Sequence, residues 1–176
     1  MADAPVVRLE GVSKAYPSDG SAAVEVLREV DLELAVGEKA SLVGPSGSGK
    51  STLLSLIAGL VRPDTGRVVV QGAALDELGD RDRAQVRAEQ VGIALQSDNL
   101  IPFLSARENI VQAIRFAGRL NRGDTRRRAD ALLDRFGIAH RADHRPRHLS
   151  GGEAQRVALA VALANEPSVL LADEVV

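Results

Sequence analysis

The spacing of apolar and polar positions changes several times along the chain, and each change predicts an element. Loose alternation over residues 6–9 predicts a first strand. Apolar residues alternate with charged ones over 24–27 and 32–34, which is typical of a half-exposed antiparallel β ribbon. Short apolar runs predict further strands at 40–43, 68–70, 91–95 and 168–172. Helices are predicted at 51–58, at 80–89, over most of 105–138 with a break near 121–123, and at 151–164.

The order of these elements indicates the fold class. A β ribbon comes first, then a strand, a loop and a helix, then a helical middle, and finally a helix and a strand. This order predicts an α/β core with an inserted helical block at about residues 97–147. A chain of 176 residues is long enough for one domain with a sizeable core, so we expect one domain over residues 1–176.

Composition excludes several classes of function. The chain is 45% hydrophobic and 26% charged with a formal net charge of −2, so no basic field predicts nucleic-acid binding. It has no cysteine, which excludes disulfides and thiol catalysis and fits a reducing cytosol. Its N-terminus lacks the features of a secretory signal, and its longest apolar stretch, 157–164, is too short to span a membrane. Any membrane contact is therefore expected through a partner.

A phosphate-binding motif lies between the strand predicted at 40–43 and the helix predicted at 51–58. The pattern G-x-x-x-x-G-K-[ST] is matched by Gly44, Pro45, Ser46, Gly47, Ser48, Gly49, Lys50 and Ser51. Glycines let backbone N–H groups converge on phosphate oxygens, and the helix dipole adds to the attraction. We expect Lys50 to neutralise the β- and γ-phosphates, Ser51 to bind Mg²⁺ and Thr52 to reach the α-phosphate. The alternative is a merely flexible Gly/Ser loop.

Two acids end the last predicted strand, where a Walker B motif belongs. We expect Asp173 to hold Mg²⁺ through water and Glu174 to polarise the attacking water as general base. The alternative is a charged pair where the strand reaches the surface.

The segment Leu149-Ser150-Gly151-Gly152-Glu153 decides the interpretation. Ser150 is typical of a helix N-cap, and the paired glycines leave the first N–H groups of the helix uncovered. This would be a second anion-binding surface in one chain. One chain does not need two γ-phosphate sites unless a partner subunit supplies the other half of each site. We therefore expect a head-to-tail dimer in which each Ser150 faces the ATP of the other subunit.

Together these motifs resemble the ATP-binding subunits of ABC transporters, over the whole chain. Residues 149–174 are most similar to the lipoprotein-releasing, macrolide-export and cell-division branch, in which the signature commonly runs LSGGEQQRVAIARAL and the acidic strand runs LLADEPT. Residues 97–102, with Glu108 and Asn109 later, are also similar to that branch. The resemblance implies a RecA-like P-loop NTPase core with an N-terminal antiparallel β ribbon and an inserted α-helical subdomain.

The resemblance also assigns roles to residues outside the motifs. Tyr16 matches the aromatic residue that stacks on adenine, although a packing role in the ribbon stays open. Gln96 matches the glutamine that touches Mg²⁺ and senses the membrane partner, although glutamines are common at strand ends. Phe103, Leu104 and Ile110 either line a groove for a coupling helix of the permease or pack within the helical block.

Departures from the family concentrate toward the end of the chain. Ala154 and Val161 stand where the branch usually has glutamine and arginine, and Val175-Val176 replace the usual Pro-Thr. The histidines His140, His144 and His148 all precede the signature, so none matches the switch histidine, and solvated positions are expected for them. Family members continue beyond the acidic strand, so we expect a fragment or a truncated product.

The prediction is thus a Mg²⁺-dependent ATP hydrolase that dimerises around two ATP molecules and drives a transmembrane permease, with export or extraction favoured. Its place would be cytoplasmic, peripheral on the inner face of the cell membrane. One rival is a kinase or GTPase sharing the phosphate loop, which LSGGE and the lack of a guanine-reading N-K-x-D motif disfavour. A second rival is a nucleotide-dependent scaffold without turnover, which the unmatched switch histidine favours.

Overall fold

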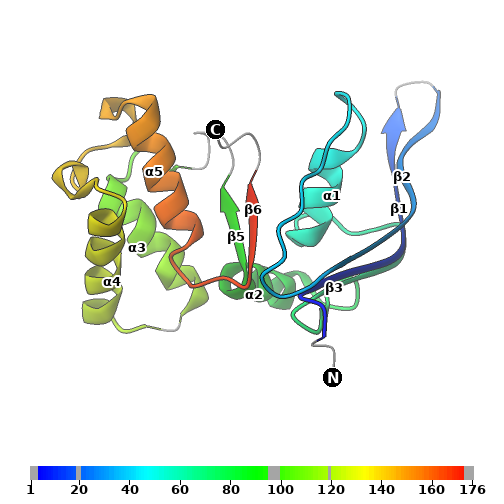
Figure 1. The fold of residues 1–176 in the computed structure, drawn as a ribbon, viewed down its shortest axis with the longest axis horizontal. Helices are drawn as coiled ribbons and strands as arrows, with labels where there is room; N and C mark the ends of the chain where they lie inside the picture. The colour runs from blue at the N-terminus through cyan, green and yellow to red at the C-terminus, as the bar shows by residue number, and fades with distance from the viewer. Residues whose placement is uncertain (1–3, 19–20, 95–99, 119, 173–176) are drawn as a thin grey trace. The chain divides into compact units, whose positions relative to one another are not determined.

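The computed structural model describes residues 4–18, 21–94, 100–118 and 120–172 and divides into two compact units, residues 1–87 and 88–176 (Figure 1). Unit 1 contains an antiparallel sheet and the helix α1 (Lys50–Ile57), whereas unit 2 contains two parallel strands and several helices. The helix α2 (Asp80–Gln90) crosses the boundary between the units. The mixed α/β content agrees with the predicted fold class.

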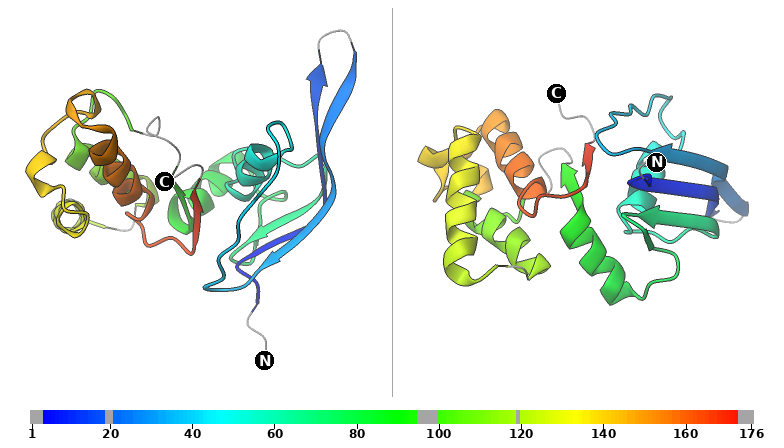
Figure 2. Two further views of the ribbon diagram at one scale, coloured as in Figure 1. Left: turned by 45° about the horizontal axis from the view of Figure 1, so that its top comes forward. Right: turned by 60° about the horizontal axis from the view of Figure 1, so that its bottom comes forward.

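The sheet of unit 1 has the strand order β2-β1-β3-β4, with antiparallel neighbours throughout. Its strands are β1 (Val7–Ser18), β2 (Ser21–Leu34), β3 (Thr65–Val70) and β4 (Ala73–Ala74). The runs predicted at 24–27 and 32–34 form one strand, which pairs with β1 as the expected ribbon (Figure 2). Between these runs Glu29 adopts a left-handed φ of 43°, and its N–H donates to Ser13 Oγ at 2.9 Å where the register shifts.

The core of unit 1 lies between the sheet and one face of α1. Val7 and Leu9 of β1 are at most 1% exposed. Leu53, Leu56 and Ile57 are the buried residues of α1, which confirms the helical spacing predicted there. This helix packs against β3 and β2. Each fully buried aliphatic side chain contributes roughly 1.5–3 kcal/mol relative to an exposed one, so this face holds α1 against the sheet.

The strand predicted at 40–43 is not formed. Residues 40–43 have no regular structure, and Val43 is 93% exposed. A strand needs a hydrogen-bonded neighbour, and within the described residues this segment pairs with none of the strands β1 to β4. An apolar run by itself therefore did not suffice to specify a strand.

Unit 2 contains the parallel pair β5 (Val91–Ala94) and β6 (Val169–Ala172), both close to their predicted positions. Their register aligns Val91 with Val169 and Ala94 with Ala172. Gly92 is required here by close approach, because a Cβ at this position would meet the Ala162 carbonyl oxygen at 2.4 Å. The missing side chain therefore lets β5 lie directly against the helix that ends at Ala162.

Three helices share one hydrophobic core in unit 2: α3 (Ala106–Ala117), α4 (Arg122–Arg135) and α5 (Gly151–Ala162). The first two lie inside the block expected at 97–147, and α5 packs on both. The interruption between helices α3 and α4 lies between the C-cap Gly118 and the N-cap Asn121. It is slightly earlier than the predicted break near 121–123. None of the helices in the described ranges is long and apolar enough to cross a bilayer.

Asn109 on α3 fixes the loop that precedes this helix. Its side chain is buried, at 4% exposure for the residue, and its Oδ1 accepts the Ile101 N–H at 2.7 Å. Its Nδ2 donates to the carbonyl oxygens of Ile101, Leu104 and Ser105 at 2.9–3.2 Å. One amide thus pairs four backbone groups of a turn. The carbonyl oxygens of Ile101 and Ser105 also accept backbone N–H groups, whereas the amide is the partner found for the Ile101 N–H and the Leu104 oxygen in the described residues.

Asn109→Ala is expected to destabilise the protein by about 1–3 kcal/mol, because it removes the partners of buried backbone groups. Urea denaturation followed by circular dichroism measures this free energy of unfolding. Gln112→Ala is the matched control, since for Gln112, on the same helix, no side-chain hydrogen bond is found in the described structure. Equal losses in the two variants would show that the buried network is not the cause.

Candidate functional site

The phosphate-binding motif forms a turn that only glycine can close at its last position. Gly49 is the N-cap of α1 and adopts a left-handed φ of 87°. A Cβ there would come within 2.9 Å of both Leu27 Cδ2 and the Val26 carbonyl oxygen. Both the dihedral angle and the contact with β2 therefore require glycine. The turn places the start of α1 directly after the loop.

The start of α1 presents N–H groups without intrahelical partners. Gly49 makes no side-chain cap hydrogen bond, and within the described part of the chain no acceptor is found for the N–H groups of Ser51 and Thr52. Ser51 is exposed and Thr52 is half-buried. Unpaired N–H groups and the positive end of the helix dipole together attract an anion.

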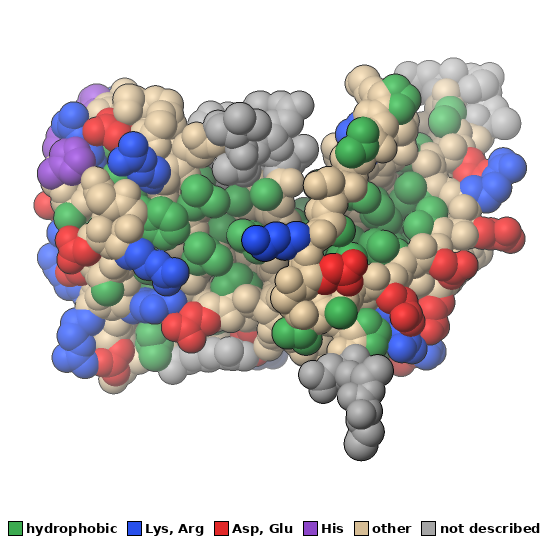
Figure 3. Space-filling model, in the orientation of Figure 1, with side chains coloured by type: hydrophobic (Ala, Val, Ile, Leu, Met, Phe, Trp, Pro, Cys, Tyr) green, Lys and Arg blue, Asp and Glu red, His purple; other side chains and the backbone are tan. Residues whose placement is uncertain are grey.

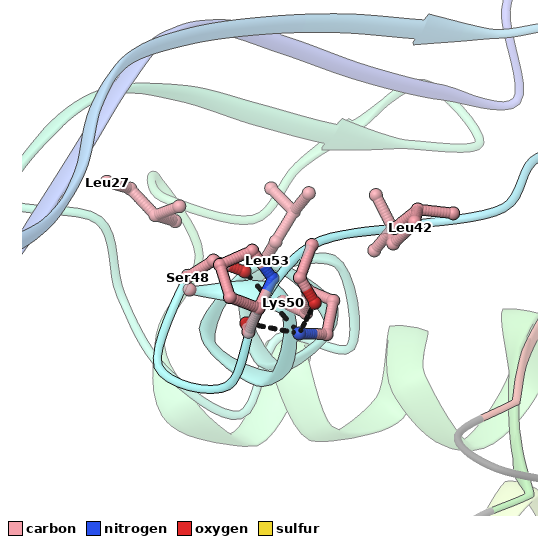
Figure 4. A pocket seen from close by; sticks show the side chains of 9 residues that line it. Leu27, Leu42, Ser48, Lys50 and Leu53 are labelled. Carbon is pink, nitrogen blue, oxygen red and sulfur yellow. Dashed lines mark hydrogen bonds between the residues drawn. The ribbon is translucent and has the colours of Figure 1, made fainter.

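Lys50 spans the loop that precedes its helix. Its Nζ donates to the carbonyl oxygens of Gly44 and Pro45, both at 2.8 Å, and to Ser48 Oγ at 3.4 Å (Figure 4). The loop is closed further by the Ser48 N–H, which donates to the Pro45 oxygen at 3.3 Å. The ammonium group is thus held among the loop atoms, where it would meet a bound phosphate.

A cavity of about 290 Å³ adjoins this loop. One side is lined by the motif residues and the other by apolar side chains of Leu27, Leu42, Val43 and Leu53 (Figure 4). An exposed loop with a cation, unpaired N–H groups and a neighbouring cavity is an arrangement that attracts a phosphate-bearing ligand. The residues of the loop itself are exposed from Gly44 to Ser48.

Tyr16, the predicted adenine contact, lies near the end of β1 and is 37% exposed. Lys14 Nζ lies 5.6 Å from the centroid of its ring, within range of a cation–π contact. Asp64 Oδ1 accepts a hydrogen bond from this ammonium at 2.6 Å, and Asp64 Oδ2 accepts the Ala15 N–H at 2.7 Å. These two bonds, first that from Lys14, lower the pKa of Asp64. Asp64 therefore holds the end of β1 in place beside Tyr16.

In unit 2 the segment 149–153 starts α5 with a complete capping box. Ser150 Oγ accepts the Glu153 N–H at 3.3 Å, and Glu153 Oε2 accepts the Ser150 N–H at 2.8 Å. Gly151 and Gly152 between them are exposed, and a Cβ on either would meet nothing within 4 Å. No acceptor is found in the described residues for the N–H groups of these two glycines. They form a second open surface that suits an anion.

Glu153 is bound on both of its carboxylate oxygens. Arg141 Nε donates to Oε1 at 2.8 Å, and His140 Nε2 lies 3.6 Å from the same oxygen. The hydrogen bond from the Ser150 N–H, followed by that from Arg141, lowers the pKa of Glu153 from its ordinary value of 4.5 to about 2. Glu153 is therefore a fixed carboxylate at neutral pH.

Comparison with known proteins identifies the family of this chain. Residues 27–176 match the family described as ABC transporter. The chain belongs to this family. The lipoprotein-releasing system ATP-binding protein LolD of Saccharophagus degradans is 45% identical over 97% of this chain and 74% of its own length. An uncharacterized ABC transporter ATP-binding protein of Thermotoga maritima is 46% identical over 96% of this chain and 71% of its own.

Solved structures of ABC cassettes share the fold. A dimeric post-hydrolysis state of the ATP-binding cassette MJ0796, bound to ADP and Pi, superimposes with a TM-score of 0.87 at 39% identity. The match covers 95% of this chain and 73% of that one. A second dimeric structure of the same cassette gives 0.87 at 38% identity. These matches confirm the predicted P-loop NTPase fold and the class of ABC-type ATP hydrolases.

The structure places only part of the predicted ABC site. Gln96, Asp173 and Glu174 lie outside the described residues. The strands that lead to them are described, and β5 and β6 end side by side at Ala94 and Ala172. Tyr16 and residues 44–52 belong to unit 1, and residues 150–153 belong to unit 2.

The groove predicted for a coupling helix is only partly available. Ile110 is fully buried in the helical core, so it packs within the block and cannot line a surface groove. Leu104 is half-buried, and Phe103 is 70% exposed. Ala154, which replaces the usual glutamine of the branch, is buried in the same core, where a longer polar side chain would need a partner.

Sequence reasoning did not assign roles to Arg141, Asp64 and Asn109, because each acts through partners that are distant along the chain or on another element. The histidines were expected to be solvated, and His140 and His148 are exposed. His144 is half-buried and lies 3.4 Å from Arg141. Figure 3 shows the histidines at the surface of unit 2 beside arginine side chains. The only sequence signal for this cluster was the concentration of arginine and histidine before the signature.

The lowered pKa of Glu153 makes a pH-dependent contribution to stability. Because the unfolded chain protonates this group near 4.5 and the folded chain near 2, the contribution is complete above about pH 4.5 and is lost as pH falls toward 2. The difference in unfolding free energy between wild type and Glu153→Gln should therefore shrink across that window. Acid–urea denaturation series of the two proteins measure it, and a difference independent of pH would contradict the assignment.

Proposed function

We propose that this chain is the ATPase subunit of an export or extraction system, acting as a head-to-tail dimer beneath a transmembrane permease. The observation that carries this proposal is the presence of two separate anion-binding helix starts in one chain, at α1 and α5. A single ATP needs only one cradle for its γ-phosphate, so the second suits the ATP held by another copy. The dimeric cassette structures support this arrangement.

The phosphate loop would hold the triphosphate chain through its backbone N–H groups, with Lys50 neutralising the β- and γ-phosphates. Ser51, Gln96 and Asp173 would hold Mg²⁺, which supplies charge neutralisation at the phosphates when it is bound. Glu174 would accept a proton from the attacking water. Gly151 and Gly152 would direct their N–H groups, with the Ser150 hydroxyl, at the γ-phosphate of the partner's nucleotide.

The names of the relatives support a proposal for the membrane partner and the cargo. Several that resemble this chain are named lipoprotein-releasing system ATP-binding proteins, which supports extraction of lipid-anchored proteins as the work that is driven. Phe103 is exposed near the Gln96 segment in sequence and would contact the permease. The subunit would then lie on the cytoplasmic face of the membrane. ATP binding would close the dimer and hydrolysis would reopen it.

Lys50→Ala in the complete transporter, reconstituted in lipid vesicles, is expected to lower ATP turnover by about 100-fold or more, because it removes a preorganised charge at the reacting phosphates. Phosphate release is the measurement. Lys39→Ala is the control, since Lys39 lies in the same unit and is exposed, and no hydrogen bond or ion pair of its side chain is found within the described structure. Unchanged turnover in Lys50→Ala would refute the proposed function.

The role of Tyr16 is tested by two substitutions. Tyr16→Ala should weaken ATP binding by roughly 3- to 10-fold, because the flat ring surface for the base is lost. Tyr16→Phe keeps that surface and should bind nearly as wild type does. Calorimetric titration of the complete subunit with ATP measures both. If the two variants bind alike, the ring serves the packing of the ribbon instead.

A further inference from the structure

The start of α5 has an electrostatic conflict that its residues must resolve. The two uncovered glycine N–H groups suit an anion, yet the third helical residue is a carboxylate, Glu153, held in place by the capping box. A fixed negative charge one turn from an anion site repels the incoming phosphate. The capping box favours folding of the helix, whereas its charge opposes the proposed use of the helix.

We propose that Arg141 is a positioning residue for nucleotide engagement, which cancels the charge of Glu153 and holds this carboxylate turned toward the Ser150 N–H. The inference rests on the proposed function, because it matters only if a phosphate approaches α5. Arg141 belongs to the 3-10 helix η2 (Ala139–Arg141), and its Nε donates to Glu153 Oε1 at 2.8 Å. Oε2 is taken by the Ser150 N–H, so both oxygens are occupied.

The position of Arg141 is itself fixed by its neighbours. Its side chain is only partly exposed, at 37%, and its NH1 lies 3.4 Å from His144 Nε2. The α3 N-terminus holds this segment through backbone hydrogen bonds, from Ala106 N–H to the His144 oxygen and from Arg107 N–H to the Ala142 oxygen. Arg107 also pairs with Asp130 on α4 at 2.6 Å. The segment that carries Arg141 is therefore held in place by helices α3 and α4.

His140 is a less suitable source of the compensating charge. Its Nε2 lies 3.6 Å from Glu153 Oε1, beyond hydrogen-bond range, and its side chain is 62% exposed. A guanidinium keeps its positive charge across the pH range of a folded protein. Arg141 is thus the permanent cation beside this carboxylate.

A double-mutant cycle in the complete subunit tests the proposal. Arg141→Met removes the charge and keeps much of the aliphatic length, and Glu153→Gln removes the opposite charge while keeping a side chain that can close the capping box. Association of the subunit, driven by Mg²⁺ and a non-hydrolysable ATP analogue, is measured by analytical ultracentrifugation. Arg141→Met should raise the analogue concentration for half-maximal association about three- to tenfold. In the Glu153→Gln background the same substitution should have little further effect.

Two further measurements separate an electrostatic role from a structural one. The loss in Arg141→Met should shrink at high salt, because screening weakens the uncompensated charge. In Arg141→Met without nucleotide, the pKa of Glu153 should rise toward its ordinary value, and NMR of the carboxyl carbon measures it. Arg147→Met is the matched control, since Arg147 is close in sequence but bonds His148 rather than Glu153, and it should associate as wild type does.

The outcomes are distinct. Normal association of Arg141→Met, or an equal loss in the wild-type and Glu153→Gln backgrounds, would overturn the role of Arg141 and leave the proposed function intact. A wild-type subunit that never associates with nucleotide would overturn the proposed function, and this inference with it. A coupled loss that salt relieves, with the pKa of Glu153 raised, would establish Arg141 as the positioning residue.

Discussion

The contact between Gly49 and β2 leaves the first N–H groups of α1 unpaired, and the phosphate-binding site of unit 1 depends on this constraint. Every helix begins with N–H groups that its own turns cannot satisfy, and most helices supply a side chain to cover them. Here Gly49 supplies none, and its left-handed angle and contact with β2 leave no room for a residue that could. Lys50 instead bonds the carbonyl groups of the loop. The helix start therefore remains available to an anion because the packing against β2 excludes a cap.

The start of α5 meets the same constraint in another way. Ser150 and Glu153 cap two of its groups, which stabilises the start of α5, and the two glycines leave the groups between them open. The cap introduces a negative charge, which Arg141 compensates from a neighbouring turn. Local helix stability and affinity for phosphate thus make opposite demands on one residue, and a third residue from outside the helix reconciles them.

Local sequence carried much of what could be predicted. The phosphate loop, the capped start of α5 and the positions of β5 and β6 all depend on residues that are adjacent in the chain, and the family matches confirm the fold class. The strand predicted at 40–43 was wrong because an apolar run does not supply the hydrogen-bonding neighbour that a strand requires. Asp64 and Arg141 escaped prediction because their partners lie 49 or 50 and 12 residues away along the chain.

The contrast between the two helix starts has a thermodynamic consequence. A ligand that binds only the folded chain stabilises the folded state, by an amount that grows with the logarithm of its concentration over its dissociation constant. The α5 start is already capped by side chains, whereas the α1 start is not, so under the proposed function a bound nucleotide would supply the α1 start with partners that the α5 start already has in part. The signature surface would then be formed before a nucleotide arrives, while the start of α1 would be capped by the nucleotide that it holds. In the proposed dimer, such a subunit would present a preformed surface to the nucleotide of its partner even before its own loop had bound one.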